Sequence, residues 1–199
     1  MSIFVIADLH LSFKNPKPMD IFGDNWTKHE EKIKKDWNEK VKEEDLVVLP
    51  GDFSWATYIE DTIPDFEYLN SLPGKKIMLK GNHDYWWTTV TNLNKLYDNM
   101  KFLQTNFYEY GEYAICGGRG WICPNDFKFD DNDEKIYKRE ENRIRLSLQA
   151  AKKKGYSKFI VIAHYPPTND KLEESLFTNL YEEYGVEKVI YGHLHGKES

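Results

Sequence analysis

Short apolar runs recur along the chain, and each of them is followed within two residues by an Asp, a His or a glycine. The runs are Ile3–Ala7, Leu46–Leu49, Lys76–Lys80, Phe159–Ala163 and Lys188–Tyr191. Continuous apolar runs of this length are typical of strands that are buried on both faces, as in a sheet covered by helices or by a second sheet. The pattern therefore predicts a set of short, buried strands spread over the whole chain.

Between these runs, apolar side chains recur every three or four residues in otherwise polar stretches. This spacing predicts helices over Thr27–Lys42, Thr88–Met100, Asp133–Lys154 and Leu172–Tyr184. Gly155 and Gly185 follow the last two, as expected for C-terminal caps. Since strands and helices alternate, we expect an α/β layered fold.

The middle of the chain follows a different pattern. Two aromatic-rich runs, Asn106–Tyr110 and Tyr113–Cys116, flank a Gly-Glu pair, which predicts a β-hairpin. A glycine-rich turn and an aspartate-rich loop come next. We interpret Asp130–Asp133 as a solvated loop and helix N-cap rather than as a third metal site.

Composition and charge narrow the class of protein. The 199 residues include 33 Asp and Glu against 27 Lys and Arg, giving a formal net charge of −6, and 40% are hydrophobic. This length and composition predict one folded domain over residues 1–199. An acidic balance disfavours non-specific binding to DNA or to anionic lipid. Cys116 and Cys123 lack the spacing of a C-x-x-C motif, so we expect reduced thiols that fill space in the core.

The first apolar run predicts a strand rather than a targeting signal. It has no basic leader, and Asp8 ends it well short of a secretory core. No run in the sequence approaches the roughly 18 apolar residues of a membrane helix. We therefore expect a cytoplasmic protein with no membrane partner.

Candidate metal ligands follow each of the apolar runs. They form the blocks Asp8-Leu9-His10, Gly51-Asp52, Gly81-Asn82-His83-Asp84, His164 and Gly192-His193-Leu194-His195. An open α/β sheet places its crevice at the carboxyl ends of its strands, and residues i and i+2 of an extended segment point to the same side. Seven nitrogen and oxygen ligands exceed what one tetrahedral ion takes, and they suit two ions that share a carboxylate.

These five blocks, in this order, resemble the motifs of the calcineurin-like metallophosphoesterases, and the resemblance covers nearly the whole chain. It implies a four-layer α/β/β/α sandwich of two mixed sheets flanked by helices. It also implies two groups of metal ligands, Asp8, His10, Asp52 and His195 for one ion and Asp52, Asn82, His164 and His193 for the other, with Asp52 bridging.

The same resemblance implies that His83 is a catalytic group outside the ligand set and that Asp84 is the carboxylate that orients it. Two divalent ions acidify a bridging water to hydroxide, which attacks phosphorus while the metals bind the phosphoryl oxygens. His83 then protonates the leaving oxygen, with Asp84 fixing its tautomer. We predict a phosphoesterase for small phosphomonoesters or phosphodiesters. The mixed ligand set favours Mn, Fe, Co, Ni or Zn over Mg or Ca, and we expect Mn.

Several other residues have both a functional and a structural interpretation. Arg119 lies in a glycine-rich turn that would let its guanidinium bind a substrate phosphate, and the alternative is a surface arginine. We expect His29 to be structural. Four tryptophans lie close to the motif blocks, at Trp55, Trp86, Trp87 and Trp121. They would either stack a nucleobase, or they would pack under the metal loops or form the wall of the pocket, and we favour the second interpretation.

The expected partner is a small phosphorylated substrate, with a nucleotide as one candidate, and no DNA. Two rival functions are a non-catalytic binding or scaffold module of the same fold and a metal-binding regulatory protein. The presence of His83 and of every ligand block favours the enzyme. The chain ends four residues after His195, where known relatives continue with further strands. We therefore expect a C-terminus that is either truncated or unusually short.

Overall fold

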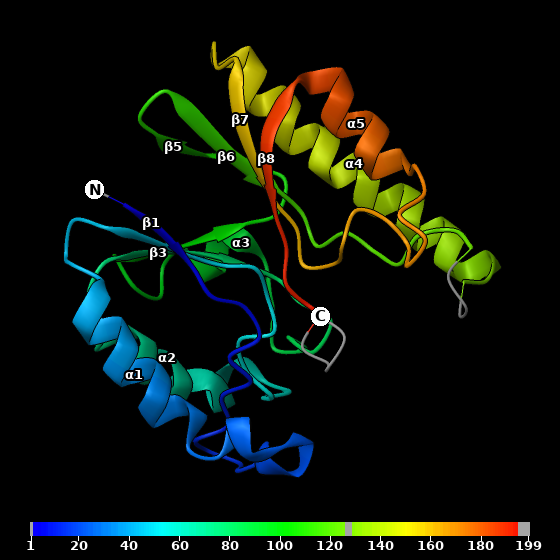
Figure 1. Ribbon diagram of the computed structural model, residues 1–199. Coiled ribbons are helices and arrows are strands. Elements are labelled where there is room, and N and C mark those ends of the chain that lie inside the picture. Colours follow the sequence, from blue (N-terminus) through cyan, green and yellow to red (C-terminus); the bar gives the residue numbers. More distant parts are fainter. Residues whose placement is uncertain (1, 126–128, 195–199) are drawn as a thin grey trace. The chain divides into compact units, whose positions relative to one another are not determined.

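The structure is a computed structural model that describes residues 2–125 and 129–194. It divides into two compact units, one formed by residues 1–78 and 82–102 and the other by residues 79–81 and 103–199. Each unit has its own sheet and its own core, and each is described by itself below (Figure 1).

The first unit is built on a four-stranded sheet in the order β1-β2-β3-β4. The strands are β1 (Ile3–Val5), β2 (Leu46–Leu49), β3 (Lys75–Leu79) and β4 (Met100–Leu103). The helices are α1 (His29–Lys40), α2 (Ile63–Asn70) and α3 (Val90–Leu93), with short 3-10 turns η1 (Asp20–Phe22), η2 (Asp24–Trp26) and η3 (Ile59–Thr62). Strand β2 pairs in parallel with both β1 and β3, so the carboxyl ends of these strands lie at one edge.

The core of this unit fixes the strand ends that carry the candidate ligands. All four residues of β2 are buried, and α2 contributes Phe66 and Leu69 to the same core cluster as Leu49 of β2. Trp37 of α1 joins that cluster and donates its indole N–H to the Pro73 carbonyl at 2.9 Å. Full burial of each such side chain stabilises the folded unit by about 1.5–3 kcal/mol, so this packing holds the strand ends in place.

The second unit contains a mixed four-stranded sheet in the order β5-β6-β7-β8. The strands are β5 (Tyr108–Tyr110), β6 (Tyr113–Gly117), β7 (Lys158–Ile162) and β8 (Val186–Ile190), and the helices are α4 (Asp131–Lys153) and α5 (Leu176–Tyr184). Strands β5 and β6 are antiparallel, whereas β6-β7 and β7-β8 are parallel. A Cβ on Gly117 would lie 2.1 Å from the Ile162 carbonyl oxygen, so the end of the β6-β7 pair requires glycine.

Helices α4 and α5 of the second unit begin at side-chain caps. Asp130 and Asp133 form a capping box at the start of α4, which confirms the predicted N-cap. Gly185 has a φ of 62° and ends α5, as expected of a glycine C-cap. Arg145 of α4 donates two hydrogen bonds, of 2.9 and 2.8 Å, to the Glu183 carboxylate of α5 and ties the two helices together.

The mixed α/β class, with two four-stranded sheets and flanking helices, is confirmed. Each predicted apolar run contains a strand, shifted by at most two residues at either end, and the predicted hairpin is β5-β6. The buried thiols of Cys116 and Cys123 are also as predicted.

The predicted helix over Thr88–Met100 is wrong in its extent, because α3 covers four residues and Met100 begins β4. Its C-cap, Asn94, accepts a hydrogen bond of 2.9 Å from the Phe102 N–H, which turns the chain toward β4. The predicted helix over Leu172–Tyr184 begins instead at Leu176, where Ser175 forms a capping box. Helix α2 and strand β4 were not predicted.

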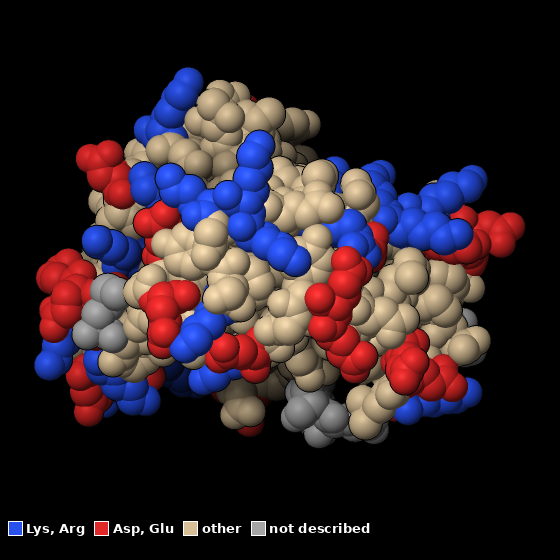
Figure 2. All heavy atoms as spheres, turned by 90° about the horizontal axis from the view of Figure 1, so that it is seen from above, with Lys and Arg blue, Asp and Glu red and all other residues tan. Residues whose placement is uncertain are grey.

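In the part of the chain that the structure describes, no helix is both long enough and apolar enough to cross a bilayer. On the face shown in Figure 2, acidic and basic side chains both occur and lie among uncharged surface.

Candidate metal centre

The loops that follow β1 and β2 pair with each other and carry three candidate ligands. The Asp8 N–H donates to the Gly51 carbonyl and the His10 N–H donates to the Asp52 carbonyl, both at 3.0 Å. Beyond them, the Trp55 N–H donates to the Leu11 carbonyl at 2.9 Å. This ladder fixes Asp8 and His10 two residues apart on one loop and places Asp52 opposite them.

The three ligands share an uncommon backbone conformation. Asp8, His10 and Asp52 have φ angles of 57°, 46° and 53°, in the left-handed region that non-glycine residues rarely adopt. A residue held there costs of the order of 1–3 kcal/mol, and such residues cluster at functional sites. The loop ladder and the core beneath it offset this cost, which makes the three residues candidates for function on backbone grounds alone.

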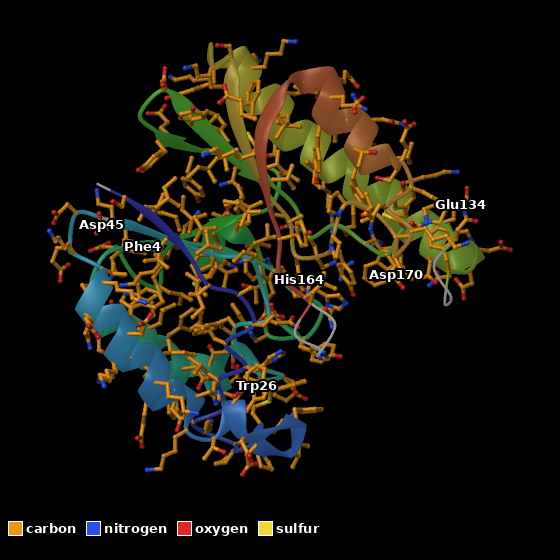
Figure 3. All side chains as sticks on the ribbon, viewed as in Figure 1. Phe4, Trp26, Asp45, Glu134, His164 and Asp170 are labelled. Atoms are coloured by element: carbon orange, nitrogen blue, oxygen red, sulfur yellow. The ribbon has the colours of Figure 1, made fainter. Side chains whose placement is uncertain are left out.

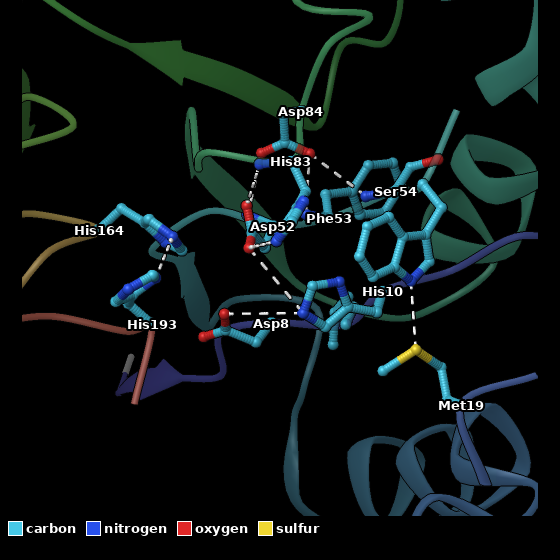
Figure 4. Close-up of polar contacts among 12 residues, drawn as sticks. Asp8, His10, Met19, Asp52, Phe53, Ser54, His83, Asp84, His164 and His193 are labelled. Carbon is cyan, nitrogen blue, oxygen red and sulfur yellow. Dashed lines mark hydrogen bonds and ion pairs between the residues drawn. The ribbon is translucent and has the colours of Figure 1, made fainter. Parts of the chain in front are cut away.

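The side chains of these residues converge. The His10 Nε2 atom lies 3.9 Å from Asp8 Oδ1 and 3.9 Å from Asp52 Oδ2, and one donor atom from each residue lies within 4.8 Å of the other two (Figure 4). All three side chains are buried. Two carboxylates and an imidazole are a donor set for a divalent ion of the first transition row, so the residues present fit a metal site.

Asp52 has the most perturbed electrostatics of the group. Burial, together with the nearby Asp84 and Asp8 carboxylates, raises the pKa of its carboxyl to about 8, while the backbone N–H groups of His83 and Asn82 oppose the shift. A cation bound by Asp52 would favour its ionised form, so metal binding and proton release at this residue are coupled.

The loop after β3 brings Asn82 and His83 to the same place in the first unit. The Asn82 backbone N–H bonds to the Asp52 carboxyl. The His83 backbone N–H also donates to this carboxyl, at 2.8 Å from Oδ1. The His83 ring is 33% exposed, and its Nε2 lies 4.0 Å from Asp52 Oδ2. A side chain both close to the cluster and open to solvent is able to exchange a proton with a bound molecule.

Asp84 holds the loop after β2 from behind. Its buried carboxylate accepts hydrogen bonds from the backbone N–H groups of Asp52 and Phe53 at 2.9 Å and of Ser54 at 3.3 Å. The Trp86 indole N–H donates to the same carboxylate at 3.0 Å. This residue therefore anchors the backbone that presents Asp52.

The tryptophans near the motif blocks divide into two kinds. Trp86 is buried in the core against Phe53 and Phe66, as the packing interpretation predicts. Trp55 stacks on His10, with ring centroids 4.8 Å apart, and its ring centroid lies 4.4 Å from that of His83. Trp55 is thus part of the wall of the site.

In the second unit, the predicted ligands His164 and His193 lie together. His164 follows β7 and is fully buried, and its Nε2 lies 3.3 Å from His193 Nδ1 (Figure 3 labels His164). The backbone N–H groups of His164 and Tyr165 both donate to the Arg119 carbonyl, at 2.9 and 3.0 Å. His193 has a φ of 70° and its ring centroid lies 4.3 Å from that of Tyr165.

The Arg119 side chain has partners within its own unit. Its guanidinium lies 3.3 Å from the fully buried Glu140 carboxylate and 4.5 Å above the Trp121 ring. Burial lowers the pKa of Arg119, and Glu140 opposes the shift. Arg119 is therefore largely buried rather than a free surface arginine, and binding of a substrate phosphate by this residue stays a prediction.

The structure thus brings Asp8, His10, Asp52, Asn82, His83 and Asp84 together in the first unit and His164 with His193 in the second. His195 lies outside the described residues. The division of the seven ligands between two ions, and the catalytic roles of His83 and Asp84, stay predictions.

Two supporting residues escaped the sequence analysis. Asp65 of α2 is buried, accepts hydrogen bonds from the Ser54 hydroxyl and from the Phe13 N–H, and so links the loops after β1 and β2. Trp26 lies beside His10, with ring centroids 5.9 Å apart. These contacts join residues of different elements, and no local pattern in the sequence predicts them.

The chain is similar to known proteins both in sequence and in structure. A family model described as calcineurin-like phosphoesterase matches residues 1–197. A phosphopantetheinyl hydrolase from Mycobacterium tuberculosis is similar in structure, with a TM-score of 0.53, 14% sequence identity, and coverage of 97% of this chain and 82% of that chain. A protein of unknown function from Aquifex aeolicus aligns with a TM-score of 0.49 and 19% identity, covering 96% and 89%. A search of curated proteins finds no match. The family match and the first of these likenesses confirm the predicted metallophosphoesterase fold.

Proposed function

Because the chain belongs to the calcineurin-like phosphoesterase family, whose members are hydrolases of phosphoester bonds, we propose that it hydrolyses a small phosphomonoester or phosphodiester with the help of two divalent metal ions. The observation that carries the proposal is the convergence of Asp8, His10 and Asp52, three buried donors within 4.8 Å of one another on strained loops. A cluster of acidic and imidazole groups held at such cost is typical of a catalytic metal site.

The proposed ligand groups are those implied by the sequence: Asp8, His10, Asp52 and His195 for one ion, and Asp52, Asn82, His164 and His193 for the other. The cluster of Asp8, His10 and Asp52 supports the first group, and the 3.3 Å approach of His193 Nδ1 to His164 Nε2 supports the pairing of these two histidines. When bound, the ions supply Lewis acidity toward the phosphoryl oxygens and an activated water. The mixed nitrogen and oxygen donors favour Mn or a neighbouring transition metal.

His83 is the proposed general acid. Its backbone is fixed by the hydrogen bond to Asp52 Oδ1, its ring is partly exposed, and Trp55 packs against it, so the imidazole is positioned and still reaches solvent. From there it donates a proton to the leaving-group oxygen, a step that matters most for poor leaving groups. Asp84 acts as a positioning residue, because its carboxylate accepts the Asp52 N–H and so fixes the loop of Asp52. The His83 N–H in turn donates to the Asp52 carboxylate.

The experiment that tests this function compares His83→Ala with the parent protein on two substrates. Metal-loaded parent protein should hydrolyse p-nitrophenyl phosphate, its bis ester or a nucleotide, and Mn should support activity that a chelator removes. His83→Ala should lose most turnover on an alkyl phosphate, typically 10²–10⁴-fold, and much less on a p-nitrophenyl ester. Asp36→Ala is the control, since Asp36 pairs with Lys40 on the surface of α1 and contacts none of the candidate site residues.

Equal turnover of parent and His83→Ala on the alkyl phosphate would remove His83 from the mechanism. Metal-loaded parent protein that hydrolyses none of these esters would overturn the enzymatic proposal in favour of a binding module. The cytoplasmic location expected from the sequence is part of the same proposal, and cell fractionation tests it.

A further inference from the structure

Next to the Asp8–His10 loop, within the first unit, lies a cavity of about 440 Å³ to which the proposed chemistry gives no task. It is lined by residues 11–13, 16–20 and 26–30, which form the segment between the His10 loop and the start of α1. Pockets for small organic ligands measure about 300–1,000 Å³. The cavity is therefore large enough for an organic group such as a nucleoside.

The cavity wall is mainly apolar and partly aromatic. Phe13 and Trp26 supply the rings, and Leu11 and Met19, both buried, supply aliphatic surface. Figure 3 labels Trp26, which ends the turn η2 just before α1. Aromatic and aliphatic walls of this kind bind planar apolar rings by stacking and by removing them from water.

A continuous series of ring contacts joins the cavity to the candidate ligands. The Trp26 centroid lies 5.9 Å from the His10 centroid and 5.3 Å from that of His29. On the other side of the series, Trp55 stacks on His10 and approaches His83. The candidate ligands and the cavity thus share one aromatic wall, and the organic group of a phosphoester at Asp8 and His10 would meet that wall.

A cation lies at the same wall. The Lys17 ammonium, a lining residue, is 4.6 Å from the centroid of the Trp55 ring. The loop that carries it is fixed, because the Lys17 N–H donates to the Ser12 hydroxyl at 3.0 Å and the Trp55 indole N–H donates to the Met19 sulfur at 3.2 Å. The cavity is therefore preformed, with a positive charge between its apolar wall and the rings beside His10.

We propose that this cavity binds the leaving-group side of the substrate, and that the substrate is a nucleoside phosphate whose base stacks in the cavity beside Trp26 while Lys17 pairs with its anionic part. This inference rests on the proposed function and deepens it, since it selects nucleotides from among small phosphoesters. A base that stacks on an aromatic side chain gains about 1–3 kcal/mol, so Trp26 should account for a measurable share of the affinity.

The test measures binding rather than turnover. Equilibrium dialysis of the full chain, without added metal, is performed with adenosine, AMP and ribose 5-phosphate. AMP should bind at least about tenfold more tightly than ribose 5-phosphate, a factor that corresponds to stacking of one base. Trp26→Ala should lower the affinity for adenosine and the affinity for AMP by about tenfold each. Trp26→Phe should keep most of the parent's affinity for both ligands. Thr27→Trp, at an exposed lining position, should block both ligands while Trp26 stays in place.

The charge is tested by a matched pair of variants on one loop. Lys17→Glu should lower the affinity for AMP about tenfold or more, since the reversed charge repels the anion. The affinity for neutral adenosine should stay within about twofold of the parent's. Lys14→Glu carries the same change of charge, but Lys14 pairs with Asp61 and does not line the cavity, so both ligands should bind it as they bind the parent.

Two outcomes would overturn the inference: ribose 5-phosphate binding as tightly as AMP, or unchanged AMP affinity in both Trp26→Ala and Thr27→Trp. The failure of the proposed function is separate. Metal-loaded protein that hydrolyses ring-free phosphoesters but does not bind adenosine contradicts the cavity assignment alone. Protein that binds adenosine through Trp26 and hydrolyses no phosphoester contradicts the proposed function, and binding of a nucleoside in the cavity is then the part of the inference that stands.

Discussion

Asp84→Ala should destabilise the first unit strongly, because Asp84 is the buried acceptor for a cluster of donors. Its Oδ2 accepts the Asp52 N–H, and its Oδ1 accepts the N–H groups of Phe53 and Ser54 and the Trp86 indole. The carboxylate is 0% exposed. The substitution removes every one of these acceptor contacts at once and leaves the donors inside the protein.

The magnitude follows from the donors that lose their acceptor. A buried donor left without a partner costs about 1–3 kcal/mol, and a water in the vacated space would recover part of that. The expected loss in free energy of unfolding for Asp84→Ala is therefore about 4 kcal/mol, near the upper end for single substitutions. Asp84→Asn keeps an oxygen for the three donors on Oδ1 and sets an NH₂ group against one N–H, so about 1–2 kcal/mol is expected.

Urea denaturation of the metal-free chain at pH 7 measures these differences. Asp98→Ala, at an exposed position in the same unit, is the control and should unfold within about 0.5 kcal/mol of the parent. The reasoning is refuted if Asp84→Ala unfolds as the control does, or if Asp84→Asn is the less stable of the two Asp84 variants.

Three further predictions concern buried charge and metal. Lys76 is 0% exposed, and burial lowers its pKa from 10.5 to about 8. The buried charge therefore destabilises the folded chain fully below pH 8, and this destabilisation disappears above about pH 10.5. Lys76→Met removes the charge but also loses the hydrogen bond to the Leu72 carbonyl. The free energy of unfolding of this variant should therefore exceed that of the parent by about 2 kcal/mol at pH 7. The urea midpoints of Lys76→Met and the parent should converge near pH 10. A difference that stays constant across pH would show that the buried charge is not its cause. Glu140→Gln should cost about 2–4 kcal/mol, because the fully buried carboxylate accepts from Arg143 at 2.7 Å and Arg119 at 3.3 Å; a loss below about 0.5 kcal/mol in urea denaturation would refute it. Mn at 100 times its dissociation constant should add about 2.7 kcal/mol, seen as a raised melting temperature that a chelator reverses, and an unchanged melting temperature would contradict metal binding to the folded chain.

The strand ends, and the loops that carry the candidate ligands, could be predicted from the sequence, because both depend on local order. A continuous apolar run such as Leu46–Leu49 specifies a buried strand, and the Gly51-Asp52 step that follows it specifies where the candidate ligand Asp52 lies. The hairpin β5-β6 and the capping box of α4 were equally local, since each lies within a few residues of the turn or cap that defines it.

The remaining features depend on contacts between distant residues. Helix α3 ends early because Asn94 bonds to the Phe102 backbone, and a polar Asn in a helical pattern gives no sign of that partner. Likewise, the sequence predicts an orienting role for Asp84, but its bonds to the backbone of Asp52 and Phe53 join residues more than 30 positions apart. The cavity beside Trp26 is formed by tertiary packing of a loop whose residues show no periodic pattern.

The count of metal ions bound per chain tests the central claim most directly. Elemental analysis of the parent protein after incubation with Mn and removal of excess ion should find two ions per chain. Asp52→Ala should lose metal from both positions, because Asp52 is proposed as the shared ligand, whereas Asp36→Ala on α1, which pairs with Lys40 at the surface, should keep both. A parent protein that binds no metal, or an Asp52→Ala variant that retains its full complement, would contradict the account.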